Sequence, residues 1–515
     1  MCGILFADDR GGERIDADLF YNGLLSQKWR GPDNIEYKLF QKRFWLGHNR
    51  LSILDDSVMA NMPMSNGRYS IIFNGEIYNH LDLREKYALE CRTNSDSETI
   101  LEGFTKYGKQ FLLELRGMFS IVILDQINSY WLAIRDCFGI KPMFLYDKND
   151  LIIISSETIA IRNIVGDLDL DEDSIEEWKA FRRPLPGKTF FSDIQEVLPG
   201  YMIDSDGCIV KLLDFNRELT KTGIGDNESL NNLFHLELKD SVRIHQLNDF
   251  DNVSLLSGGL DSAVILGLSD ISTCYTVGLE SNNEFEGAMD SANVLNRNLK
   301  RIIVTENELI ESWEHLMKLR GEPLTVPNEG LIYLVCKSMN RREKVVLTGE
   351  GADELLFGYD RIFFWAAQNE EFNIDDFLKY YCYQNINLTN RMRDYIEELA
   401  KDKTSIEFLE DFFIEFHLPL LLRRMDFASM AASKEARVPF VDVRMFELMY
   451  RLPFEYRFNL KRSKYPIVEL AKRLRLKGAI QRKKIGFSAT MNNVDKETEY
   501  QNFQEYCLKF LKWKK

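Results

Sequence analysis

Cys2 stands directly behind the initiator methionine, and this position gives its side chain an unusual chemical setting. Removal of Met1 would leave a residue that carries both a thiol and a free α-amino group. Reference pKa values of about 7.7–8.0 for the amine and about 8.5 for the thiol allow the amine to take the thiol's proton near neutral pH. The sequence therefore predicts a nucleophile that brings its own base and needs no catalytic histidine.

Four short motifs follow Cys2 in order. They are residues 30–33 (Arg-Gly-Pro-Asp), 47–53 (Gly-His-Asn-Arg-Leu-Ser-Ile), 74–79 (Asn-Gly-Glu-Ile-Tyr-Asn) and 95–98 (Ser-Asp-Ser-Glu). Together with the cysteine they resemble the N-terminal-nucleophile glutaminase domain of class II glutamine amidotransferases. This resemblance implies that Cys2 attacks the side-chain amide of glutamine. The Asn74 side-chain amide and the Gly75 backbone N–H would then face the tetrahedral oxyanion.

The same resemblance implies how glutamine is held. A guanidinium can bind a carboxylate through two parallel hydrogen bonds, so Arg50 is expected to take the substrate's α-carboxylate. Asp96, with help from Glu76, would pair with the α-ammonium group. The other residues expected at this glutamine site are Leu51 and Ile53.

Residues 254–262 (Ser-Leu-Leu-Ser-Gly-Gly-Leu-Asp-Ser) lie between an apolar strand pattern and a helical one. They resemble the pyrophosphate-binding loop of ATP pyrophosphatases. The glycines would let the backbone approach phosphates, and the hydroxyls of Ser257 and Ser262 would donate to them. Residues 254–262 contain no Gly-Lys-Ser/Thr of a Walker loop, so we expect cleavage of ATP to AMP and pyrophosphate. The expected ATP-binding residues are Leu256, Ser257, Gly258, Gly259, Asp261, Ser262, Val277, Thr348 and Gly349.

A second cluster, residues 348–354 (Thr-Gly-Glu-Gly-Ala-Asp-Glu), resembles another motif of the same synthetases. It implies that Asp353 joins Asp261 in holding Mg²⁺ and that Glu350 lies near an acyl-adenylate. The alternative interpretation is a solvated acidic helix start, which the helix dipole would favour. Near the end of the chain, residues 482–487 match a basic segment in which Lys484 would neutralise phosphate charge.

Residues 422–426 and 435–442 extend the match, so that the resemblance to glutamine-hydrolysing asparagine synthetases covers about residues 2–490. It implies that ATP adenylates an acceptor carboxylate and that ammonia from Cys2 reaches this intermediate through an internal channel. Residues 321–329 depart from the bacterial pattern because they contain no arginine and are acidic. Aspartate is therefore the leading acceptor, and another carboxylate, such as a sugar uronate, is the main alternative.

Composition limits the partners. The formal net charge of −15 over 515 residues argues against general binding to nucleic acid or anionic membranes. The eight cysteines show no metal-like spacing with the six histidines, and a reducing compartment fits them. We see no signal peptide and no apolar run long enough to cross a membrane, so we expect a cytoplasmic protein with small-molecule substrates. A homodimer is compatible with the resemblance.

The elements expected from hydrophobic periodicity fall into two domains, residues 2–215 and 228–515. The first contains short alternating strands at 44–54, 69–79, 119–125, 129–136, 142–147 and 150–156, with helices at 16–27 and 97–107. This pattern predicts an antiparallel αββα sandwich of the N-terminal-nucleophile hydrolase type. The second alternates short apolar strands with helices, which predicts a parallel doubly wound sheet followed by a wholly helical region beyond residue 359.

Overall fold

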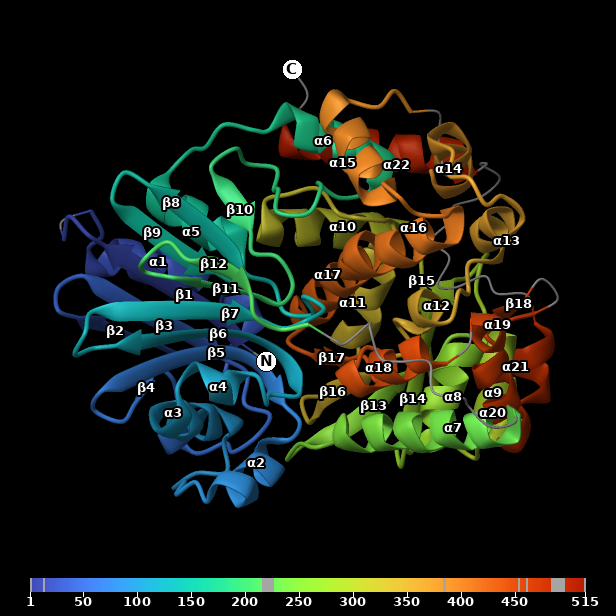
Figure 1. The fold of residues 1–515 in the computed structure, drawn as a ribbon, viewed down its shortest axis with the longest axis horizontal. Coiled ribbons are helices and arrows are strands. Elements are labelled where there is room, and N and C mark those ends of the chain that lie inside the picture. Colours follow the sequence, from blue (N-terminus) through green and yellow to red (C-terminus); the bar gives the residue numbers. More distant parts are fainter. Residues whose placement is uncertain are drawn as a thin grey trace.

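The computed structural model describes residues 2–12, 14–214, 227–382, 386–452, 454–459, 462–482 and 496–513. It places two antiparallel sheets in the N-terminal part and a parallel sheet with many helices in the C-terminal part, side by side (Figure 1). Lys484 and residues 217–226 of the expected linker lie outside the described residues.

The N-terminal part is built on two six-stranded sheets. The first has the order β10 (Ile194–Glu196), β8 (Phe144–Lys148), β9 (Leu151–Ser155), β1 (Cys2–Asp9), β3 (Phe44–Arg50) and β2 (Asn34–Phe40). The second has the order β12 (Ile209–Lys211), β11 (Tyr201–Asp204), β7 (Tyr130–Arg135), β6 (Gly117–Asp125), β5 (Tyr69–Ile77) and β4 (Met64–Ser65). Every neighbouring pair of strands in both sheets is antiparallel.

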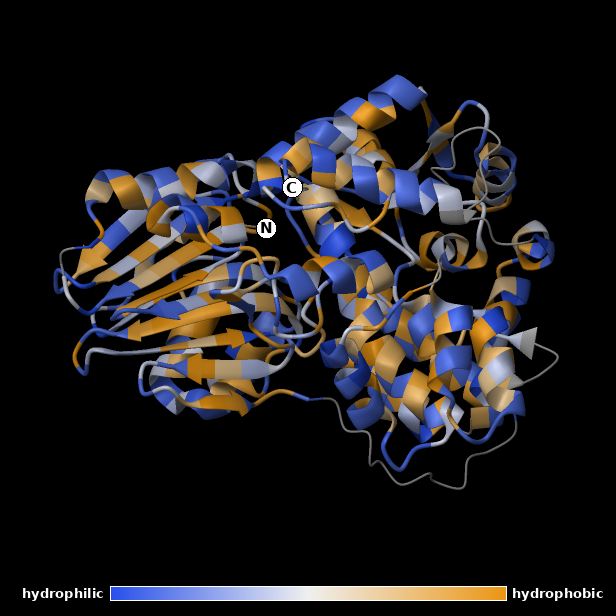
Figure 2. Cartoon of the chain, turned by 90° about the horizontal axis from the view of Figure 1, so that it is seen from above, coloured by the Kyte–Doolittle hydropathy of each residue, from blue (hydrophilic) through white to orange (hydrophobic). Residues whose placement is uncertain are grey.

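Three hydrophobic layers stabilise this sandwich. Ile4 and Phe6 of β1 pack with Ile72 and Val122 between the sheets. Helices α1 (Ala17–Ser26), α5 (Thr158–Val165) and α6 (Glu172–Phe181) contribute to the outer layer of the first sheet, and α2 (His80–Tyr87), α3 (Asp96–Tyr107) and α4 (Lys109–Leu112) lie on the second. The strands are largely orange in Figure 2, whereas the helices carry blue on one side. The αββα architecture expected from the sequence is confirmed.

The C-terminal part contains a five-stranded parallel sheet. Its order is β15 (Asn298–Val304), β14 (Thr273–Leu279), β13 (Asp251–Leu255), β16 (Glu343–Leu347) and β17 (Glu435–Arg437). The strand order reverses direction between β13 and β16. Ligands of doubly wound sheets bind in the crevice outside the carboxyl ends of strands at such a point. Residues 256–262 and 348–353 follow these two strands directly.

Helices cover both faces of this sheet, so the expected doubly wound architecture is confirmed. One face packs on α7 (Asn227–Ile244), α8 (Leu260–Leu268), α9 (Phe285–Val294), α20 (Tyr465–Arg473) and α21 (Lys477–Gln481). The other packs on α10 (Glu306–Arg320), α11 (Glu329–Lys337), α17 (Leu418–Met430) and α22 (Lys496–Leu511). A largely aromatic cluster joins α13 (Asp360–Gln368), α14 (Ile374–Tyr381), α15 (Asn390–Ala400), α16 (Ser405–Phe412) and the π-helix η3 (Phe413–His417).

The helical C-terminal region expected beyond residue 359 is confirmed, but three short strands interrupt it. Glu435–Arg437 forms β17, which pairs in parallel with β16, and Phe458–Asn459 pairs with Arg462–Ser463 in a small hairpin. Three residues are too few for strand periodicity to appear in the sequence, and β17 exists because β16 offers an open edge. The remaining elements are α12 (Ala352–Leu355), α18 (Val443–Arg451), α19 (Phe454–Arg457) and the 3₁₀ turns η1 (Lys28–Arg30) and η2 (Val58–Ala60).

Within the described ranges, none of the helices has the length and apolarity needed to cross a membrane. All eight cysteines are free thiols.

Candidate active sites

The first candidate site is a pocket of about 350 Å³ beside the start of β1. It gathers Cys2, residues of three of the motifs that follow it and residues between those motifs, which are far apart in the chain. The residues that line it are Cys2, Arg50, Leu51, Ile53, Leu54, Ala60, Met62, Phe73, Gly75, Glu76, Ser95, Asp96 and Ser97. Every residue expected at the glutamine site is therefore present, apart from Asn74, whose side chain contacts Cys2 directly.

The sheet fixes the nucleophile. Cys2 opens β1 opposite Arg50 of β3, and its backbone nitrogen donates to Asn74 Oδ1 at 3.0 Å. Once Met1 is removed, this nitrogen is the α-amine. Burial raises the pKa of the Cys2 thiol, but several interactions, among them those with His48 and with the Leu51 backbone, together outweigh it and lower the pKa to about 6. His48 donates through Nε2 to the Phe73 carbonyl, so its other ring nitrogen is unprotonated in the neutral ring.

Asn74 and Gly75 lie on β5, across from β6. The Asn74 side-chain oxygen faces the Cys2 nitrogen. Its NH₂ group donates a long hydrogen bond of 3.5 Å to the Ser156 hydroxyl. Gly75 has a φ of +156°, and a Cβ at this position would overlap the Met118 carbonyl. Glycine is thus required here, because only it allows the backbone to pass so close to β6. Together the two residues offer an amide and a backbone N–H beside the thiol.

Charged groups also line the pocket. The Arg50 guanidinium donates to the Ser57 carbonyl at 2.9 Å and to Asn61 Oδ1 at 2.6 Å, which ties down the loop that covers the pocket. Burial raises the pKa of Asp96 to about 7, although its carboxylate accepts a hydrogen bond from the Ile77 N–H. Burial also raises the pKa of Glu76, despite its ion pair with Arg437 at 3.0 Å.

The second candidate site lies at the carboxyl ends of β13 and β16. Gly259 caps α8, and the turn before it is held by hydroxyl groups: Ser262 Oγ lies 3.0 Å from Ser257 Oγ and accepts from the Ser257 N–H. Gly349 packs against this turn so closely that a Cβ would overlap the Ser262 nitrogen. The helix start and the serine hydroxyls form an arrangement that can hold phosphate groups. Leu256 and Val277 are buried beneath the loop.

A lysine that the sequence analysis missed completes this site. Lys464 Nζ lies 2.8 Å from Asp261 and 2.5 Å from Asp353. It stands in left-handed conformation just before α20, between other basic residues that gave no pattern from which to select it. Lys484, which we selected instead, lies outside the described residues.

The two aspartates fit the expected magnesium ion. They come from the first turns of α8 and α12 and converge on one positive centre, the Lys464 ammonium group. Mg²⁺ often takes one or two carboxylates together with substrate phosphates and water, and this pair provides such a donor set. In the part of the chain that the structure describes, no group of three or more His, Cys, Asp or Glu side chains is arranged to hold a metal.

Glu350 stands beside the phosphate loop and is paired with an arginine. Its carboxylate lies 2.8 Å from Arg424 of α17, which also donates to Asn328 Oδ1 at 3.4 Å. Asn328 belongs to the acidic segment 321–329. Arg320 holds both acids of that segment, with Glu322 at 3.0 Å and Glu329 at 3.7 Å.

Buried ion pairs join the two sites. Arg30 donates to the Cys2 carbonyl at 3.0 Å and to Asp426 of α17 at 2.9 Å. Lys141 reaches the same Asp426 at 3.2 Å. Glu76 of the first pocket pairs with Arg437, which ends β17. The two halves of the chain therefore meet through charged groups that are shielded from water.

This architecture defines a class. An antiparallel sandwich that begins with a buried cysteine, joined to a parallel sheet with a phosphate loop, is the arrangement of a glutamine-dependent, ATP-using amide-forming ligase. Residues 1–211 match the family model described as glutamine amidotransferase domain, and residues 234–509 match the model described as asparagine synthase. The chain belongs to the asparagine synthase family.

Curated relatives agree with this assignment. The chain is 27% identical over 530 residues to asparagine synthetase [glutamine-hydrolyzing] 1 of Bacillus subtilis, with 89% of this chain and 82% of that protein covered. It is 28% identical over 428 residues to a putative asparagine synthetase of Methanocaldococcus jannaschii, covering 80% of this chain and 70% of the relative. A putative asparagine synthetase of Mycobacterium tuberculosis is 24% identical, covering 86% and 78%.

Proposed function

We propose that this chain converts aspartate to asparagine, using glutamine as the nitrogen donor and ATP as the source of activation. Glutamine would be hydrolysed at Cys2, and its ammonia would attack a β-aspartyl adenylate at the second site. The observation that carries the proposal is the geometry of α17. One helix presents Asp426 to Arg30 at the Cys2 site and Arg424 to Glu350 at the phosphate loop. A single rigid element thus contacts the residues of both reactions.

At the first site, the thiolate of Cys2 attacks the side-chain amide of glutamine. The α-amine of Cys2 takes the proton of the thiol and later returns it. Asn74 favours this transfer because its side chain holds the same nitrogen in place. The Asn74 NH₂ group and the Gly75 N–H stabilise the oxyanion, and losing such a donor typically costs about 10²–10³ in rate. Arg50 and Asp96 bind the two charged ends of the amino acid.

At the second site, Ser257, Ser262 and the start of α8 bind the phosphates of ATP, while Lys464 neutralises charge that develops on them. Asp261 and Asp353 would hold Mg²⁺, which when bound neutralises phosphate charge and orients the leaving pyrophosphate. Glu350, held by Arg424, is placed to face the activated acceptor. When ATP binds, Lys464 would turn from the aspartates toward the phosphates, which its long and flexible side chain allows.

Besides the buried ion pairs, the interface between the domains has an apolar part that would suit the passage of ammonia. One apolar cluster joins Met118 and Ile140 of the sandwich with Leu422, Val438 and Val441 of the second domain. An uncharged wall favours neutral NH₃ over ammonium, because burying an unpaired charge is costly. Ammonia kept in this form retains the lone pair that it needs for attack.

A sugar uronate or another large carboxylate is the second candidate acceptor. Segment 321–329 contains no arginine, and both of its acids are engaged by Arg320. Among the described residues, Arg424 lies beside Glu350 and could bind an α-carboxylate. An acceptor without an α-carboxylate would not need this contact with Arg424.

Pyrophosphate release decides between these acceptors. The full chain is incubated with ATP, Mg²⁺ and glutamine, and pyrophosphate is followed with aspartate or with each of several uronates. Aspartate is expected to stimulate release above the glutamine-only rate. If a uronate stimulates release and aspartate does not, the aspartate assignment is wrong and the amidation chemistry stands.

A further inference from the structure

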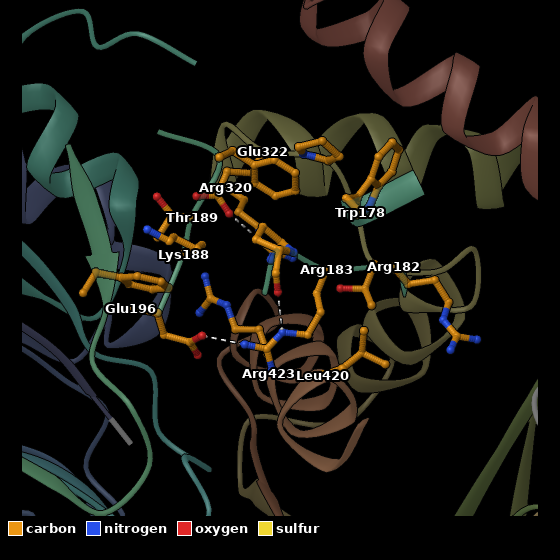
Figure 3. Close-up of a pocket in the computed structure, with 15 residues that line it drawn as sticks. Trp178, Arg182, Arg183, Lys188, Thr189, Glu196, Arg320, Glu322, Leu420 and Arg423 are labelled. Carbon is orange, nitrogen blue, oxygen red and sulfur yellow. Dashed lines mark hydrogen bonds and ion pairs between the residues drawn. The ribbon is translucent and has the colours of Figure 1, made fainter. Parts of the chain in front are cut away.

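A second pocket, about 510 Å³ in volume, opens where the two domains meet, away from Cys2 and from the phosphate loop. Figure 3 shows the basic side chains around it, which come from several elements, with the Arg182 head group pointing away from the others. One wall belongs to the segment between α6 and β10 of the sandwich, and the other to residues 320–325 and α17. The proposed reaction assigns no role to this pocket.

The charge of the lining is unusual for so acidic a chain. Five lining side chains are basic and two are acidic. The basic residues are Arg182, Arg183, Lys188, Arg320 and Arg423, and the acidic ones are Glu196 and Glu322. An excess of positive charge in a concave site concentrates anions there, even though the whole chain carries a formal charge of −15.

Ion pairs compensate part of this excess, because Arg423 pairs with Glu157 at 2.7 Å and Arg320 pairs with Glu322 at 3.0 Å. Glu196 is shared by Arg183 at 2.5 Å and Arg135 at 3.0 Å. Lys188 is exposed at the mouth and has no ion pair within the described part of the chain. The Arg320 side chain is only 7% exposed. Its Nη1 makes no hydrogen bond with a described residue, and the Glu329 carboxylate lies 3.7 Å from it. Donors therefore remain for a ligand.

The rest of the lining indicates an organic ligand of moderate size. Trp178, Phe144, Phe190 and Leu420 supply apolar surface beside the charged groups. Guanidinium groups bind phosphate and carboxylate groups through paired hydrogen bonds. We propose that this pocket binds a small molecule bearing phosphate or carboxylate groups, which contacts both domains at once.

Its position relates the ligand to the second site. Arg423 lines the pocket, and the next residue, Arg424, holds Glu350. The anionic group could thus belong to the far end of a large acceptor, and this alternative rests on the proposed function. It could also belong to a separate effector. The chemistry recognised is the same in both cases.

Calorimetric titration of the full chain with inorganic phosphate, and separately with citrate, tests the pocket. An ATP analogue that cannot be cleaved is kept saturating, so that the phosphate loop is filled. We expect binding of at least one probe, weakened at least fivefold by Lys188→Gln and by Arg183→Gln. Lys86→Gln, a matched loss of charge on exposed α2, should leave it unchanged. Absence of binding, or equal binding by all variants, would overturn the proposal.

Kinetics then separates the two sources without depending on the titration. Michaelis constants are measured for a uronate and for the same uronate bearing a phosphate group. If the acceptor itself fills the pocket, Lys188→Gln raises KM only for the phosphorylated compound. If a separate effector fills it, KM values are unchanged while probe binding is lost. Inactivity toward every acceptor would refute the proposed function, and the titration would still decide the pocket.

Discussion

Arg30 and Asp426 form a buried ion pair of 2.9 Å between the two domains, and the same guanidinium holds the carbonyl of the nucleophilic Cys2. Both side chains are almost completely shielded from water, with 0% and 2% exposure. A buried pair of this kind contributes less to net stability than its short distance suggests, because both charges were desolvated to form it. Its clearer consequence is that Cys2 cannot shift without a response from α17.

Loss of the nucleophile should separate the two reactions. Cys2→Ala is expected to reduce glutamine-dependent amide formation by on the order of a thousandfold or more, because no other thiol lines that pocket. Synthesis from added ammonium should persist, since the second site is intact. Amide formation from each nitrogen source is measured on the same preparation. Equal loss with both sources would mean that the two sites are not distinct.

Lys464 should act only in the ATP reaction. Lys464→Gln is expected to lower pyrophosphate release by about 10²-fold, as for the loss of one group that stabilises transition-state charge. Glutamine hydrolysis should change little. Lys472→Gln, at an exposed lysine on the helix α20 that follows Lys464, is the matched control. An undiminished rate of pyrophosphate release would remove Lys464 from the mechanism.

Glutamine binding should weaken in acid. Because the pKa of Asp96 is raised to about 7, its carboxylate is present above that pH and is lost as the pH falls through it. The neutral acid cannot pair with the α-ammonium group, so KM for glutamine should rise up to about tenfold between pH 8 and pH 6. KM for ammonium, corrected for its own ionisation, serves as the control. A KM for glutamine that is constant over this range contradicts the role of Asp96.

Breaking the ion pair between domains should destabilise the fold. Asp426→Ala leaves Arg30 and Lys141 buried without their shared carboxylate, and such losses cost about 3–5 kcal/mol. Thermal unfolding followed by circular dichroism would show a clearly lowered Tm. Glu114→Ala removes a partner of the exposed pair with Lys86 and should cost less than about 1 kcal/mol. Similar decreases in Tm for both variants would show that burial does not increase the contribution of the Arg30–Asp426 pair to stability.

The sequence was a good guide where local pattern dominates. The strands around Gly75 and the helix after Asp96 were predicted from alternation and helical periodicity, because each spans enough residues to show its period. Residues 254–262 were interpreted as a phosphate loop from their resemblance to ATP pyrophosphatases, and the strand and helix expected on either side of Gly258 and Gly259 are present. These are features that a short stretch of chain specifies by itself.

What the sequence did not predict depends on distant partners. Arg30 and Asp426 are separated by 396 positions, and the sequence around either residue does not indicate that the other is its partner. Lys464 is one of several basic residues in its segment, and only the approach of Asp261 and Asp353 distinguishes it. Contacts of this kind arise from the packing of whole domains, which composition and periodicity do not encode.

Transfer of labelled nitrogen tests the central claim most directly. The full chain is incubated with glutamine labelled with ¹⁵N in its side-chain amide, together with ATP, Mg²⁺ and aspartate, and the products are identified by mass spectrometry. The account predicts ¹⁵N-labelled asparagine, with AMP and pyrophosphate formed in equal amounts. Formation of ADP and phosphate, or release of all the label as ammonium with no labelled amide from aspartate or any uronate, would contradict it.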